Sequence, residues 1–197
     1  MADGSAVVSI EGTSVLVTTV CKPRLTGYAG FMPLTVDYRH KWSAAGRIPT
    51  NYHRRDLGPS EYEILTSRMI DRSIRPLFAK GFGHDVQLTC NVLALDSSND
   101  PCVMAINAAS ASLALSDVPW AGPVAAVRLS YDDEKDVCLV NPTRRQLKNN
   151  PLNVVVTAAG GKRVIMIDGE ADDLPPRKFV ACLEVIDLST FSSTSVR

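Results

Sequence analysis

Short runs of β-branched and other apolar residues, each bounded by turn-forming residues, constrain the fold of this chain more than any other feature. Such runs are typical of β-strands. Three longer segments with helical spacing interrupt them. The chain is therefore expected to combine sheet and helices, with strands over residues 6–10, 14–20, 32–38, 86–95, 124–131, 137–140, 152–157 and 164–167.

Two pairs of these runs are joined by turns short enough for antiparallel hairpins. Glu11-Gly12-Thr13 separates the first two runs. A turn that contains Gly160-Gly161-Lys162 separates the last two. We therefore expect one hairpin near each end of the chain.

The clearest helix begins after Ser60, because Ser60-Glu61-Tyr62-Glu63 is a capping box, and Pro76 ends it after Arg75. A second helix follows Asp100, an N-cap with proline at the next position, and runs to about Ser116. A third starts near Pro175. Apolar residues spread around the first helix and predict burial on more than one side; they are Ile64, Leu65, Met69, Ile70 and Ile74.

The composition is that of a globular protein, with 197 residues of which 45% are hydrophobic and 21% charged. We expect one domain over residues 1–188, followed by a disordered Ser/Thr-rich tail over residues 189–197. No apolar run reaches the length of a membrane span, and the N-terminus has no targeting character.

The cysteines and aspartates do not form a metal-binding pattern. The five cysteines never occur as C-x-x-C or beside a histidine, so we expect free thiols in a reducing compartment and neither a metal site nor a disulfide framework. The scattered spacing of Asp96, Asp100, Asp168 and Asp173 favours turn and cap roles. The histidines have no catalytic partner nearby in the sequence.

Basic residues are concentrated in one segment, although 21 basic and 21 acidic residues cancel over the whole chain. Residues 39–80 contain nine Lys and Arg but only four Asp and Glu. The loop within this segment places arginines beside aromatic rings. Arginine binds phosphate oxygens and an exposed ring stacks on an unpaired base, so the loop is a candidate RNA contact or a solvated basic loop; its candidate residues are Arg47, Tyr52, His53, Arg54 and Arg55.

Arg68, Arg72 and Arg75 share one face of the first helix because they occur at i, i+4 and i+7. Glu61 and Asp71 lie near the same face. Internal ion pairs are therefore the favoured interpretation of these three arginines.

Several blocks resemble the first RNase PH-type core domain of the polynucleotide phosphorylase family, nearest its animal mitochondrial form. The resemblance covers about residues 2–183. It rests on Phe31-Met-Pro-Leu-Thr-Val-Asp-Tyr38, Ala44-Ala-Gly-Arg-Ile-Pro-Thr50, Tyr52-His-Arg-Arg55, Glu63-Ile-Leu-Thr-Ser-Arg68, Ile70-Asp-Arg-Ser-Ile-Arg-Pro-Leu-Phe78 and Ser116-Asp-Val-Pro-Trp-Ala-Gly-Pro123.

The resemblance implies an α+β, RNase PH-like fold, in which a mixed sheet of the ribosomal-protein βαβ type packs against helices. It also implies a homotrimeric ring around single-stranded RNA, with the loop matching residues 52–55 gripping the RNA backbone. A second core domain of the same enzyme would hold inorganic phosphate and a divalent metal such as Mg²⁺. The implied compartment is the mitochondrion.

Two departures from the family pattern imply that this domain lacks the phosphate-binding site and the catalytic carboxylates. Asn99-Asp100-Pro101-Cys102 stands where active relatives have a phosphate-binding turn, and Lys148-Asn149-Asn150-Pro151 stands where they have paired aspartates. We thus expect an RNA-binding, ring-forming core domain of a phosphate-dependent 3′→5′ exoribonuclease that itself binds no cofactor. A purely structural assembly domain and an enzyme for small anionic metabolites are the alternatives.

The resemblance also bears on the ends of the chain. The match begins late in the family's first strand and stops before the second core domain. A fragment or a short isoform is therefore expected.

Overall fold

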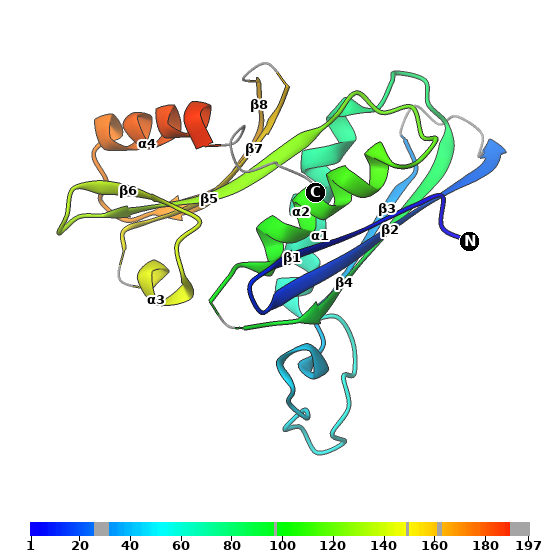
Figure 1. The fold of residues 1–197 in the computed structure, drawn as a ribbon, viewed down its shortest axis with the longest axis horizontal. Helices are drawn as coiled ribbons and strands as arrows, with labels where there is room; N and C mark the ends of the chain where they lie inside the picture. The colour runs from blue at the N-terminus through cyan, green and yellow to red at the C-terminus, as the bar shows by residue number, and fades with distance from the viewer. Residues whose placement is uncertain (26–31, 97, 149, 161–162, 190–197) are drawn as a thin grey trace.

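A computed structural model describes residues 1–25, 32–96, 98–148, 150–160 and 163–189, and these form two four-stranded sheets with helices packed against them (Figure 1). All eight expected strands are confirmed, most of them longer than expected. They are β1 (Gly4–Ile10), β2 (Thr13–Leu25), β3 (Leu34–Arg39), β4 (His84–Ala94), β5 (Val124–Asp132), β6 (Val137–Val140), β7 (Leu152–Ala159) and β8 (Arg163–Ala171).

The first sheet is mixed and has the order β1-β2-β4-β3. The expected hairpin of β1 and β2 is antiparallel, whereas β3 runs parallel to β4 and is connected to it through a helix. This connection is the βαβ unit that parallel neighbours require. The second sheet has the order β6-β5-β7-β8 and is antiparallel throughout, including the expected hairpin of β7 and β8.

The three expected helices are confirmed as α1 (Glu61–Ile74), α2 (Pro101–Ala114) and α4 (Pro176–Ser189). Ser60 and Asp100 cap the first two with their side chains, as their positions predict. α1 ends at Ile74 with Arg75 as its C-cap, as Pro76 predicts, and the chain then forms the 3-10 turn η2 (Arg75–Leu77). Two short elements were not expected: η1 (Trp42–Ala45) and α3 (Arg144–Leu147).

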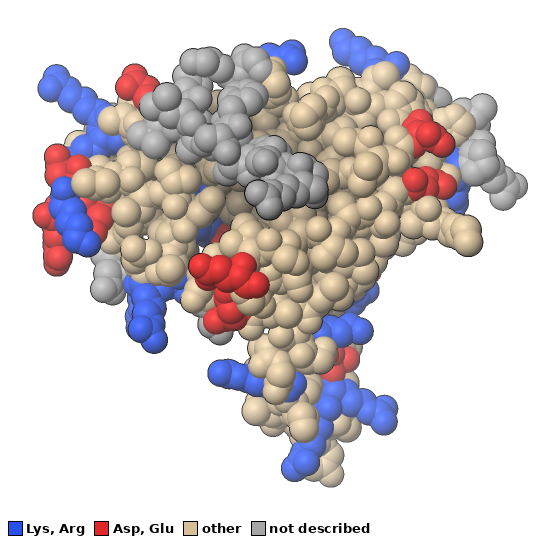
Figure 2. Space-filling view, in the orientation of Figure 1, with Lys and Arg blue, Asp and Glu red and all other residues tan. Residues whose placement is uncertain are grey.

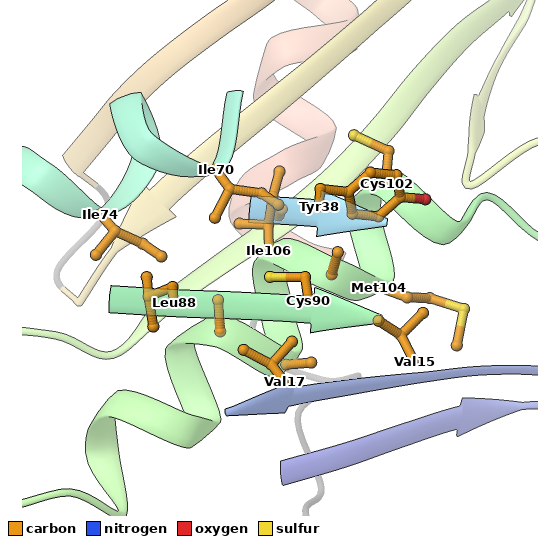
Figure 3. Close-up of a cluster of buried hydrophobic side chains, with 14 of the residues drawn as sticks. Val15, Val17, Tyr38, Ile70, Ile74, Leu88, Cys90, Cys102, Met104 and Ile106 are labelled. Carbon is orange, nitrogen blue, oxygen red and sulfur yellow. The ribbon is translucent and has the colours of Figure 1, made fainter. Parts of the chain in front are cut away.

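The larger core lies between the first sheet and helices α1 and α2, whose side chains point toward one another in Figure 3. Tyr38, Ile70, Leu88 and Ile106 are almost fully buried there. Full burial of one such apolar side chain contributes about 1.5 to 3 kcal/mol. A smaller core, which includes Cys182, joins the second sheet to α4.

The expectation that α1 is buried on more than one side is wrong. Its buried residues recur at helical spacing on a single face, and Ile64 and Leu65 remain 50% and 52% exposed. Strand β3, α2 and strand β8 of the second sheet contact α1, and Ile64 and Leu65 on its opposite side face solvent. Of the disordered tail predicted over residues 189–197, Ser189 is instead the last residue of α4, and residues 190–197 lie outside the described residues.

No helix in the described ranges is long and apolar enough to cross a membrane.

Candidate nucleic-acid interface

Residues 41–59, here called the projection, protrude from one end of the first sheet between β3 and α1 (Figure 1). The projection starts with η1, which ends at Gly46 with a left-handed φ of 65°. Glycine adopts this conformation without steric cost. The backbone N–H of Leu95 donates to the carbonyl of Ala44 at 3.0 Å, which ties η1 to the end of β4.

One buried carboxylate joins the two ends of the projection. Glu63 accepts hydrogen bonds from the backbone N–H of His40 at 2.7 Å and of Ser60 at 2.6 Å, and one from the Ser60 hydroxyl at 3.0 Å. Burial raises the pKa of Glu63, but these hydrogen bonds to the charged form outweigh it and leave the pKa below its ordinary value. The base of the projection is therefore fixed to the first turn of α1.

The five predicted RNA-contact residues all lie on the exposed surface of the projection. Tyr52 is 96% exposed, and its ring meets the His53 ring edge-on at 5.2 Å. Arg47, Arg54 and Arg55 form no ion pair within the part of the chain that the structure describes. Figure 2 shows basic side chains gathered over the projection.

This arrangement has the two groups that a single-stranded nucleic acid needs. Unpaired guanidinium groups bind phosphate oxygens, and a solvent-facing aromatic ring stacks on a base. Asp56 is the single acid among residues 41–59, so the projection carries net positive charge.

The three arginines predicted on one helix face, two in α1 and one at its C-cap, divide into two kinds. Arg75 forms a bidentate ion pair with Asp71, through contacts of 2.6 and 2.9 Å, and donates to the carbonyl of Met32 at 2.7 Å. Arg68 and Arg72 are exposed. The predicted internal ion pairing is confirmed for Arg75 and is not found for the other two within the described residues.

The N-terminus of α2 carries its own anion. One carboxylate oxygen of Asp100 accepts from the backbone N–H of Cys102 at 3.1 Å, and the other accepts from Nε of Arg128 at 2.6 Å. The side chains of Arg128 and Asp100 are only 13% and 15% exposed, and Asn153 holds the guanidinium from its other side at 2.6 Å. Pro101 supplies no N–H, so this helix end has little left to offer a phosphate.

Asp96 also has a structural role. It accepts from the backbone N–H groups of Asn99 and Ser98 and from the Thr13 hydroxyl, and these bonds hold its pKa far below the ordinary value. Turn and cap roles are thereby confirmed for Asp96 and Asp100. At the other departure from the family pattern, the Asn150 amide donates to the hydroxyl of Ser130 at 2.9 Å.

A hollow of about 480 Å³ lies at the opposite end of β4 from the projection. Its lining includes Cys21 and His84, and the buried Nδ1 of His84 has no hydrogen-bond partner among the residues that the structure describes. None of the sequence-predicted site residues lines this hollow. It is therefore separate from the candidate interface.

Family models match both halves of the chain. The 3′ exoribonuclease family, domain 1, matches residues 1–119, and the 3′ exoribonuclease family, domain 2, matches residues 122–185. The boundary falls between the strands of the first sheet and those of the second. The chain belongs to the 3′ exoribonuclease family. That residues 1–188 act as one domain stays a prediction.

Among curated proteins, the chain is similar to polyribonucleotide nucleotidyltransferases. It is 45% identical over 183 residues to that of Methylacidiphilum infernorum and 44% identical over 174 residues to that of Desulfotalea psychrophila. These matches cover 93% and 88% of this chain but 26% and 25% of the relatives. The chain thus spans about a quarter of their length.

Solved structures confirm the expected α+β, RNase PH-like fold. An Archaeoglobus fulgidus exosome with RNA bound to its active site matches with a TM-score of 0.71 and 18% identity, over 93% of this chain and 79% of that chain. Rice Rrp46 matches with a TM-score of 0.73 and 13% identity, over 96% of this chain and 84% of that chain. These similarities concern the fold alone.

Proposed function

We propose that this chain is an RNA-binding, ring-forming core domain of a polyribonucleotide nucleotidyltransferase, which degrades RNA from its 3′ end with phosphate. The exposed arginines of the projection, which lie beside Tyr52 and form no ion pair among the described residues, are the observation that carries the proposal. Sequence identity of 45% to a polyribonucleotide nucleotidyltransferase supports the assignment to that class of enzyme.

The proposal assigns binding, and not the chemical step, to this domain. The Asp100 carboxylate and Arg128 neutralise each other at the N-terminus of α2, so a phosphate there would find no free guanidinium. Inorganic phosphate and a divalent metal such as Mg²⁺ would then act in a second core domain of the same enzyme. The domain itself would hold no cofactor.

The same proposal covers assembly and compartment. We propose that the enzyme is nearest the animal mitochondrial form, assembles as a homotrimeric ring and resides in the mitochondrion. Analytical ultracentrifugation of the purified enzyme and fluorescence microscopy of the tagged enzyme in cells test these two parts. A stable monomer, or staining outside mitochondria, would contradict the respective part.

The double change Arg54→Ala/Arg55→Ala tests RNA binding by the projection. Because each phosphate contact releases counterions, the loss of two contacts should flatten the slope of log K against log salt by about 1.4 on single-stranded RNA. Affinity for a labelled oligo(A) should fall at least tenfold. Fluorescence anisotropy at several salt concentrations measures both.

The thermal midpoint of the double variant should equal that of the parent, because both side chains face solvent. Unchanged RNA affinity would rule out the projection as the binding site. Release of nucleoside diphosphates from poly(A) and inorganic phosphate by the purified chain would show that the domain is catalytic after all.

A second candidate function is that of an assembly domain without an RNA contact. The exposed apolar pair Ile64 and Leu65, beside Arg68 and Arg72 on the outer face of α1, favours it. The change Ile64→Ser/Leu65→Ser separates the two functions. If the chain is only an assembly domain, Ile64→Ser/Leu65→Ser reduces oligomerisation, while Arg54→Ala/Arg55→Ala does not change RNA affinity.

A further inference from the structure

The tip of the projection contains a backbone outlier at a predicted RNA-contact residue. Arg54 has a φ of 50°, in the left-handed region. A long side chain is uncommon there, because its Cβ crowds the backbone. Such a conformation persists only where surrounding interactions hold it, and it often occurs at functional sites.

Asn51 supplies the interactions that hold this turn. Its side-chain oxygen accepts from the backbone N–H of Arg55 at 3.1 Å, and its side-chain nitrogen donates to the carbonyl of the same residue at 2.6 Å. Its own carbonyl accepts from the backbone N–H of Arg54 at 2.9 Å. Three hydrogen bonds from one residue therefore close the turn over Tyr52 and His53.

The remainder of the tip offers little else to fix its shape. Residues 50–60 are all exposed, so no buried side chain anchors them to the core. The hydrogen bonds that Glu63 accepts from His40 and Ser60, here called the clamp at Glu63, lie at the base of the projection, at its junctions with β3 and α1. The hydrogen bonds of Asn51 to Arg54 and Arg55 therefore define the local shape of the turn at the tip.

We propose that Asn51 is a positioning residue for RNA binding: it fixes the turn that presents Tyr52, Arg54 and Arg55 together, and does not itself contact RNA. This inference rests on the proposed function. A turn that is already ordered avoids the entropy loss of being ordered on binding, which raises affinity. Since the Asn51 side chain is uncharged and engaged with Arg55, its removal leaves the number of phosphate contacts unchanged.

The test compares Asn51→Ala with Arg54→Ala/Arg55→Ala in the same 197-residue chain, using a labelled oligo(A) and a series of salt concentrations. Asn51→Ala should weaken binding roughly fivefold, a typical cost of losing preorganisation, with the salt slope of the parent. Asn51→Ser should recover part of the affinity, because a serine hydroxyl forms the same kind of turn more weakly. Thr50→Ala, at an exposed neighbouring position, is the matched control and should bind like the parent.

Thermal midpoints of all variants should agree with that of the parent, since the tip buries no core side chain. Parental affinity of Asn51→Ala would overturn the positioning role, and so would a salt slope as flat as that of Arg54→Ala/Arg55→Ala, because the change at an uncharged residue would then have removed phosphate contacts instead of only loosening the turn. Failure of the proposed function is distinguishable: there, the parent itself does not bind RNA, or Arg54→Ala/Arg55→Ala binds as the parent does.

Discussion

The projection and the N-terminus of α2 are both built from charged residues near the same end of β4, yet their charges are arranged in opposite ways. In the projection, three arginines face solvent without an ion pair among the described residues. At α2, Arg128 and Asp100 face each other at 2.6 Å and are largely removed from water. One region can bind an external anion, and the other already contains its own.

The difference shows that residue type alone does not define a binding site. An arginine whose guanidinium is shared between Asp100 and Asn153 has used its donors inside the protein. An arginine at a solvent-exposed turn that forms no internal ion pair keeps its N–H donors available for a ligand. The contrast also applies at the C-terminal end of α1, where the C-cap residue Arg75 is paired and Arg72 is exposed.

Removal of the internal anion should have the largest effect. Asp100→Ala leaves Arg128 without its partner and α2 without its cap, so the free energy of unfolding should fall by about 3 kcal/mol. RNA affinity should remain that of the parent, because the projection is untouched. Urea denaturation and fluorescence anisotropy measure the two effects.

Asp100→Asn is the matched control for this prediction. It keeps a side chain that caps a helix well but removes the charge, so its stability loss should be smaller. Parental stability of Asp100→Ala would show that the buried pair is not structural and would break the comparison.

Removal of the exposed ring should have the next largest effect, and on binding alone. Tyr52→Ala should weaken binding of single-stranded RNA by about 2 kcal/mol, because stacking on one base contributes about 1 to 3 kcal/mol. The salt slope should not change. Leu57→Ala, at another exposed apolar position of the projection (73% exposed), should bind like the parent; equal losses in both variants would contradict a stacking role.

Local sequence signals predicted most of the fold. Short β-branched and apolar runs bounded by turn-forming residues identified all eight strands, and the capping residues Ser60 and Asp100 identified the starts of α1 and α2. These signals succeed because their partners lie within a few residues. The exposed arginines of the projection were recognisable for the same reason, since Gly46 and Pro49 indicate a loop.

The features that the sequence did not reveal depend on distant partners. Arg128 lies 28 residues from Asp100, and no local pattern indicates that the two pair. Ile64 and Leu65 have the spacing of buried residues, but they remain 50% and 52% exposed among the described residues. The sequence predicted one part of the clamp at Glu63, because the capping box with Ser60 is a local pattern. It did not predict the hydrogen bond from His40, which lies 23 residues away.

Acidification should loosen the base of the projection. The pKa of Glu63 is lower in the folded chain than its ordinary value, so its stabilising effect is complete above the unfolded pKa of about 4.3 and is lost as the pH falls through the folded value. The thermal midpoint should therefore decrease from about pH 6 to about pH 3. Glu63→Gln should show a shallower decrease, while Glu61→Gln, an exposed neighbour on the same turn, should follow the parent; identical profiles for all three would exclude the clamp.

The smallest effect is expected at an arginine that is neither buried nor on the projection. Arg72→Ala should change the free energy of unfolding by less than about 0.5 kcal/mol, as is usual for exposed positions. Arg75→Ala should lower it by about 2 kcal/mol, because the change leaves Asp71 and the Met32 carbonyl without their donor. Equal losses in urea denaturation would mean that exposure does not separate structural arginines from available ones, and the contrast between the projection and the N-terminus of α2 would then need another basis.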